Sequence, residues 1–106
     1  MKNVHELSDK ELTELAAHSI GFKITYNYLG SQNANCTFYP LIDDSDAFAL
    51  IVYHGMLVDT DYNGGVICGN AMIEANYDNV EIPSKTSHAT RRSIVKCAAK
   101  IALKKL

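Results

Sequence analysis

The stretch SHATRRSIVKCAAKIALKKL, residues 87–106, carries the longest unbroken helical pattern of the chain. At about 100° per residue, the apolar side chains of such a helix gather on one side and the basic side chains on the other. The pattern predicts an amphipathic surface helix with a wide apolar face, capped by Thr86 or Ser87. The apolar side holds Ile94, Val95, Ala98, Ile101, Ala102 and Leu106, and the basic side holds Arg92, Lys96, Lys100 and Lys104.

Two residues break this pattern. Arg91 projects into the apolar side and Leu103 into the basic side. A guanidinium that turns inward at the first turn of a helix needs an acceptor. The acidic segment from Asp43 to Asp46 is the candidate, since an Arg–carboxylate pair has a suitable bidentate geometry. We therefore predict that Arg91 binds this segment.

The acidic segment precedes a second helical pattern, DAFALIVYH, over residues 46–54. Asp43 or Ser45 is expected to cap a helix at about residues 45–54, because acids suit the positive end of a helix. Apart from Asp46 and His54, this short helix is apolar nearly all round. Such a helix must be covered on more than one side, either within the domain or by a second subunit. Together with Leu103 on the polar side of the last helix, this suggests a homodimer.

The rest of the chain reads as one further helix and several strands. Ser8 and Glu11 have the spacing of a capping box, which predicts a first helix at about residues 9–20, ending at Gly21. Apolar alternation and turn residues then predict the strands. The predicted strands are residues 22–28, 35–39, 56–60, 66–69, 71–77 and 80–82. The strand at 35–39 returns beside 22–28, and the strand at 66–69 returns beside 56–60 after a turn at Asn63-Gly64. We expect one α+β domain over residues 1–106, a small, mostly antiparallel sheet of four or five strands with three helices on its faces.

Composition places the chain among ordinary globular domains. Apolar residues make up 47% and charged residues 21% of its 106 residues. The net charge of −2 divides into −9 for residues 1–84 and +7 for residues 85–106. The favoured interpretation is that the basic helix lies across an acidic body. The alternative is an outward basic stripe that meets an anionic partner.

The cysteines indicate a reducing compartment. Cys36, Cys68 and Cys97 are odd in number and far apart, and we expect reduced thiols packed as small apolar groups in a cytoplasmic protein. Close ligand pairs for zinc are absent, and no cofactor motif occurs. No apolar run has the roughly 18 residues that a membrane span needs, so no membrane partner is expected.

Two segments together resemble a known family. The first reads Pro40-Leu41-x-Asp43-Asp44-x-Asp46-Ala47-x-x-Leu50, and the second reads Ala89-Thr90-Arg91-Arg92-x-Ile94-Val95-x-x-Ala98-Ala99-x-Ile101. They resemble a family of small tailed-phage and prophage proteins, described as a phage α/β/α sandwich domain. The chain departs from it at Ser45, where glycine is common, at Phe48 and at Cys97. Because no activity is established for that family, the resemblance implies origin and fold but no chemistry.

Three functions follow as hypotheses. The preferred one is an accessory protein that binds a host or phage protein without catalysis. One alternative is nucleic-acid binding through the basic last helix, and another is a small metal-dependent hydrolase at Asp43–Asp46 with His54. Helix capping plus an ion pair is the favoured explanation of the aspartates, so no catalytic or metal residue is assigned. The candidate binding residues are Asp43, Asp44, Asp46, Arg91, Arg92, Lys96 and Lys100.

Overall fold

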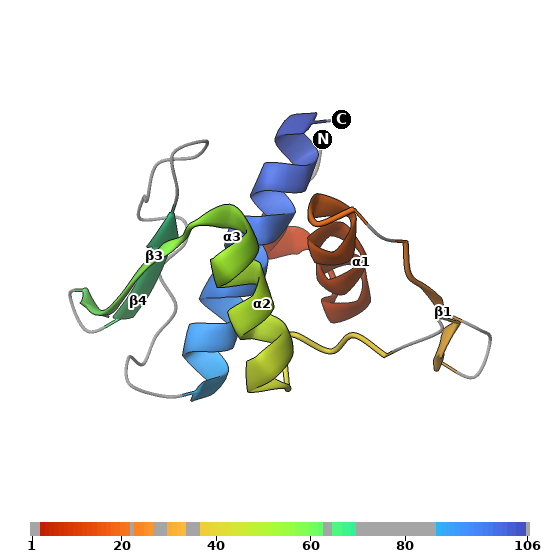
Figure 1. Cartoon of the computed structure of the whole chain (residues 1–106), viewed down its shortest axis with the longest axis horizontal. Helices are drawn as coiled ribbons and strands as arrows, with labels where there is room; N and C mark the ends of the chain where they lie inside the picture. Colours follow the sequence, from red (N-terminus) through yellow and green to blue (C-terminus); the bar gives the residue numbers. More distant parts are fainter. Residues whose placement is uncertain are drawn as a thin grey trace.

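The structure, a computed structural model, describes residues 3–21, 23–26, 30–33, 37–62, 65–69 and 87–105. This part of the chain is α+β, with three α-helices packed together and a short β-hairpin on either side of them (Figure 1). No helix within it is both long and apolar enough to cross a membrane. The elements are η1 (Val4–Glu6), α1 (Asp9–Ser19), β1 (Thr25–Tyr26), β2 (Gln32–Asn33), α2 (Asp44–His54), β3 (Leu57–Tyr62), β4 (Gly65–Gly69) and α3 (Ser87–Lys105).

Helix α3 lies at the centre of the described structure. Helices α1 and α2, strand β4 and η1 all pack on it. The described residues of the predicted apolar side are buried, but so are Ser93, Lys96 and Cys97 on other sides of the helix. The prediction of a surface helix is therefore wrong. Small side chains such as Ser93, Cys97 and Ala99 let neighbouring elements approach α3 on several sides, and Leu103 packs against the core instead of facing solvent.

Helix α1 begins with the predicted capping box. The backbone N–H of Glu11 donates to Ser8 Oγ at 3.1 Å, and the N–H of Ser8 donates to Glu11 Oε1 at 3.0 Å. The helix ends at Ser19, and Gly21 follows in the left-handed region with φ of 93°. Leu12 and Ala16 are fully buried where α1 packs on α3. The local sequence therefore fixes both ends of α1 as expected.

Helix α2 is capped by Asp43, one of the two predicted caps. Its carboxylate accepts the N–H of Ser45 at 2.8 Å and that of Asp46 at 3.2 Å. Gly55 closes the helix in the left-handed region with φ of 62°. Leu50 and Ala47 are buried, yet several apolar side chains on the opposite side of α2 stay exposed. The described residues thus cover α2 on one side only, not on the several sides expected.

The strands form two separate antiparallel pairs. In β1–β2, Thr25 pairs with Asn33 and Tyr26 with Gln32. In β3–β4, Leu57 pairs with Gly69, and the register shifts between Asp59 and Tyr62. A sheet of four or five strands is not confirmed, since the two pairs do not join in the described residues. The strands predicted at 71–77 and 80–82 lie outside those residues.

The first hairpin returns earlier than predicted. Gln32 and Asn33, which the sequence places in a loop, pair with β1, whereas residues 37–39 belong to no strand. The Phe38 N–H donates to Gln32 Oε1 at 2.7 Å, and Gln32 Nε2 donates to the Phe38 carbonyl. One side-chain amide thus supplies the donor and the acceptor that a paired strand would supply. The predicted residues 35 and 36 lie outside the described part.

Two cysteines lie where α3 packs on β4. Cys68 and Cys97 are buried free thiols, as predicted. A hydrogen bond with Cys97 and burial raise the pKa of Cys68, and the Cys68 thiol also lies 3.5 Å from Met56 Sδ. Both side chains therefore act as packing groups of the core, and Cys36 lies outside the described residues.

Replacing Ser93 tests the central position of α3. On a surface helix, Ser93→Leu would leave stability nearly unchanged, because Ser93 lies away from the predicted apolar side. In the structure Ser93 is fully buried, so the larger side chain should destabilise the fold by about 1–3 kcal/mol. The exposed His88 supplies the control, and His88→Leu should change stability by less than about 0.5 kcal/mol. Urea unfolding of both variants gives the comparison.

Candidate functional site

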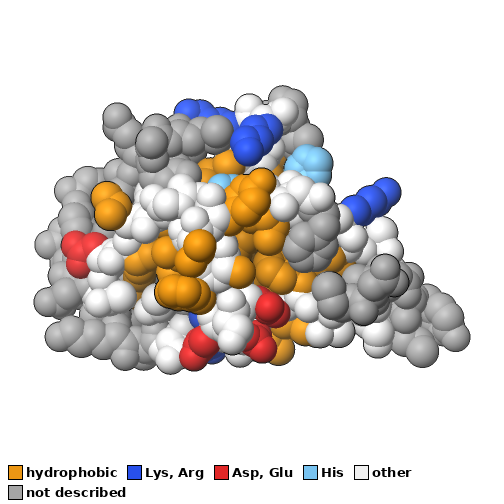
Figure 2. All heavy atoms as spheres, in the orientation of Figure 1, with side chains coloured by type: hydrophobic (Ala, Val, Ile, Leu, Met, Phe, Trp, Pro, Cys, Tyr) orange, Lys and Arg blue, Asp and Glu red, His pale blue; other side chains and the backbone are white. Residues whose placement is uncertain are grey.

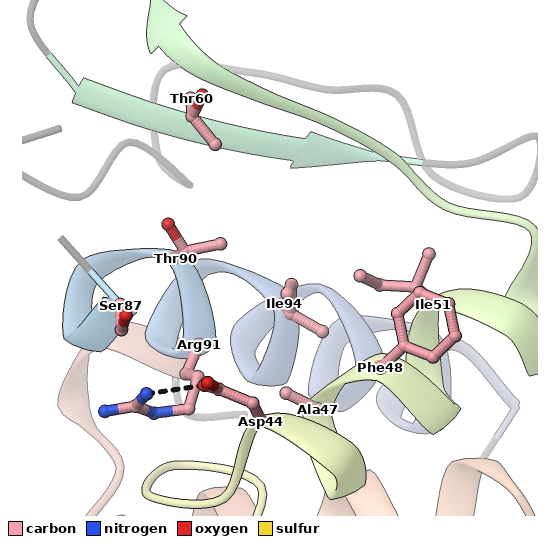
Figure 3. A pocket seen from close by; sticks show the side chains of 9 residues that line it. All are labelled: Asp44, Ala47, Phe48, Ile51, Thr60, Ser87, Thr90, Arg91 and Ile94. Atoms are coloured by element: carbon pink, nitrogen blue, oxygen red, sulfur yellow. Dashed lines mark hydrogen bonds and ion pairs between the residues drawn. The ribbon is translucent and has the colours of Figure 1, made fainter. Parts of the chain in front are cut away.

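A groove opens where α2, α3 and β3 meet (Figure 3). Its volume is about 340 Å³. Side chains of α2 and α3 form its apolar part, while hydroxyl and charged groups lie around them. The apolar residues are Ala47, Phe48, Ile51 and Ile94, and the polar residues are Asp44, Thr60, Ser87, Thr90 and Arg91. The groove therefore combines an apolar surface with hydrogen-bonding groups, which is the usual composition of a binding site.

Arg91 joins the two helices at one end of this groove. Its Nη1 donates to Asp44 Oδ1 at 2.7 Å, and its Nε donates to the Leu41 carbonyl at 2.9 Å. The predicted contact between Arg91 and the acidic segment is confirmed. It is not the bidentate pair expected, since the guanidinium divides its donors between a carboxylate and a main-chain carbonyl. The Arg91 side chain is only 16% exposed, while that of Asp44 is 79% exposed.

The other two aspartates accept hydrogen bonds from backbone N–H groups. Asp43 caps α2, and Asp46 Oδ2 accepts the N–H of Tyr39 at 2.9 Å. The three carboxylates thus have three different sets of donors. Among the residues that the structure describes, no group of three histidine, cysteine or acidic side chains could hold a metal ion. Capping, ion pairing and loop attachment account for these aspartates, in agreement with the favoured explanation.

His54 lies at the opposite end of α2 from the aspartates. Its Nε2 is 2.9 Å from Ser19 Oγ, at the end of α1. Because the Ser19 hydroxyl donates its proton to the Ala16 carbonyl, we assign the Nε2 proton to the contact with Ser19. Burial, and then the positive charge of Lys105, hold the pKa of His54 below its usual value. No local sequence pattern indicates this contact, since Ser19 and His54 are 35 positions apart.

The basic side of α3 turns largely toward the chain itself. Arg92 Nη1 lies 3.0 Å from Asp9 Oδ1, and Lys96 is buried with its Nζ 3.1 Å from His5 Nδ1. The alternative of an outward basic stripe is wrong at Lys96, because η1 packs over this side of α3. Lys100 is half-buried. The contact between Arg92 and Asp9 agrees with the interpretation in which α3 lies across an acidic body.

Part of the groove is visible in the sequence. Asp44, Ala47 and Ile51 recur at helical spacing, and so do Ser87, Thr90, Arg91 and Ile94, which places each set on one face of a helix. The Arg91 prediction then brings the two faces together. Thr60 was missed, since its place in the groove depends on the path of β3 after Gly55, for which the sequence carries no signal.

The two partners of the Arg91 contact should differ in their effect on stability. Arg91→Ala leaves the Leu41 carbonyl without its donor and should cost about 1–3 kcal/mol. Asp44→Asn affects a mostly exposed carboxylate and should cost less than about 1 kcal/mol. Denaturant unfolding of both variants measures the difference. Equal effects would mean that the ion pair, and not the carbonyl contact, holds the segment.

The lowered pKa of His54 predicts an acid-sensitive fold. The unfolded chain binds a proton at His54 more readily than the folded chain, so stability is full above about pH 6.5 and falls as the pH drops toward the folded pKa. The His54→Gln variant should lose less stability than the native chain over this range, and His18→Gln is the matched control. Thermal melts between neutral and mildly acidic pH test this. Parallel curves for the native chain and His54→Gln would contradict it.

Comparisons with known proteins assign no family to this geometry. The chain matches no protein-family model, no curated protein and no solved structure.

Proposed function

We propose that this chain is a small accessory protein of phage or prophage origin that binds another protein in the host cytoplasm without catalysing a reaction. The resemblance of its two quoted segments to the phage family supports the origin. The α/β/α sandwich with four or five strands belongs to the same proposal, since its remaining strands are predicted at 71–77 and 80–82, outside the described residues. The groove between α2, α3 and β3 is the observation that carries the binding role.

The groove suits a protein segment with a bulky apolar side chain. Its volume of about 340 Å³ lies at the small end of ligand pockets, where one or two large side chains fit. Ala47, Ile51 and Ile94 give an apolar surface on which such a side chain loses its contact with water. Phe48 stands at the edge and is 63% exposed, so a bound segment would cover it. Burial of this surface would supply most of the affinity.

The charge beside the groove favours a basic residue next to that side chain. One carboxylate oxygen of Asp44 accepts a hydrogen bond from Arg91. The side chain is mostly exposed, so its negative charge can act on a partner. A lysine or arginine of the bound segment could approach it, whereas a phosphate would be repelled. Because Arg92 and Lys96 are engaged within the chain, these observations favour a protein partner over nucleic acid.

Blocking the groove tests this proposal. Thr60 is an exposed strand residue at the groove, and Thr60→Trp should fill part of it without changing the core. Thr25→Trp is the matched control, since Thr25 is an exposed strand residue of the other hairpin. The tagged native chain and both variants are used to capture proteins from host cells with and without phage, and captured proteins are quantified by mass spectrometry.

The expected result is a protein enriched by the native chain and by Thr25→Trp, and reduced at least tenfold with Thr60→Trp. A tenfold loss corresponds to about 1.4 kcal/mol of binding free energy. Circular dichroism melts verify that both variants fold. Equal capture by the native chain and Thr60→Trp would reject the groove as the binding site, and enrichment of nucleic acid alone would reject a protein partner.

A further inference from the structure

The side of α2 that faces away from α3 carries an apolar surface. Phe48, Val52 and Tyr53 are 63%, 66% and 62% exposed, and Leu57, which follows the helix closely, is 80% exposed. Ala49 lies among them and is also exposed. We call these five residues the α2 outer face. Figure 2 shows the apolar side chains gathered over this helix. Large apolar side chains exposed together on one side of a helix in this way mark an interaction site.

The two ends of the α2 outer face carry opposite charges. Asp43, Asp44 and Asp46 lie at the start of α2. At its other end lies His54, close enough to Lys105 for the charge of that lysine to act on it, and Lys104 is next to Lys105 in the last turn of α3. In Figure 2, most of the acidic side chains lie below the apolar surface, with part of a basic side chain between them, and basic side chains lie above it. The charge around the α2 outer face therefore changes from negative to positive along the axis of α2.

We propose that the α2 outer face is the interface of a homodimer in which the two α2 helices pack antiparallel about a twofold axis. A twofold interface uses the same surface on both copies, so that surface must be complementary to itself. In the antiparallel arrangement, the aspartates of each copy face the terminal lysines of the other. A parallel arrangement would place like charges together, which is unfavourable.

The charge pattern is the reason for choosing a second copy as the occupant. One copy supplies both acidic and basic groups, so each finds its opposite charge on the second copy. The apolar side chains between them then contact the same apolar side chains of the second copy. The groove lies on the neighbouring side of α2, with Phe48 at the border of the two surfaces. The dimer therefore leaves Thr60 and Arg91 of the groove accessible, although it shares Phe48 and Asp44 with the groove. It does not depend on the proposed binding function.

Sedimentation velocity of the full chain over a wide concentration range tests the dimer. The native chain should show a reversible monomer–dimer equilibrium. Val52→Lys places a charge on the α2 outer face and should weaken dimerisation at least a hundredfold. Ile42→Gln is the control, because Ile42 is 72% exposed but lies beside α1 residues Asp9 and Thr13, and the uncharged variant should dimerise like the native chain. Circular dichroism verifies the fold of each variant.

The orientation has its own test. The double variant Lys104→Glu, Lys105→Glu should weaken the dimer about tenfold at low salt, because the new acids face the aspartates of the other copy. The effect should be smaller at high salt, because salt screens this repulsion. A native chain that stays monomeric at every concentration would overturn the proposal, as would a Val52→Lys variant that dimerises normally. If Ile42→Gln abolished dimerisation as strongly as Val52→Lys, the α2 outer face would not be the interface. A lysine-exchanged variant that dimerises as tightly as the native chain at low salt would overturn the antiparallel arrangement.

Discussion

The guanidinium of Arg91 connects the start of α3 with the start of α2. Arg91 belongs to the first turns of α3, and its partners, Asp44 and the Leu41 carbonyl, lie about fifty positions earlier in the chain. The contact fixes the start of α2 against the start of α3. The contact holds the ends of these helices together, and the groove lies beside it, where α2 presents the small side chain of Ala47. The packing of α2 on α3 and the candidate site therefore both depend on the Arg91 contact.

The position of α3 explains most of the remaining packing. A helix in contact with neighbours on several sides needs small or apolar side chains all round, and Ser93, Cys97 and Ala99 meet this need. Lys96 is the exception, since it reaches His5 from a buried position. A lysine stem covers apolar surface along its length while its ammonium finds a polar neighbour, so the basic residue is compatible with the centre of the fold.

Local signals in the sequence were sufficient for the helices and for the Arg91 contact. The capping box at Ser8, the cap at Asp43 and the glycines that close α1 and α2 depend on neighbours a few positions away, and each appears in the structure. The errors concern contacts that the periodicity of helices and strands does not describe. The burial of Lys96 depends on where η1 packs, and the early return of the first hairpin depends on the amide of Gln32 reaching Phe38. Hydrophobic periodicity contains no information on either.

Helix α2 is attached at both of its ends. Asp44 holds the first turn to α3, and His54 holds the last turn to the end of α1, so polar contacts of different kinds secure the two termini. A helix restrained in this way has little rotational or translational freedom relative to its support. Its exposed side is consequently preorganised, and association there loses less conformational entropy than association with a loosely attached helix would.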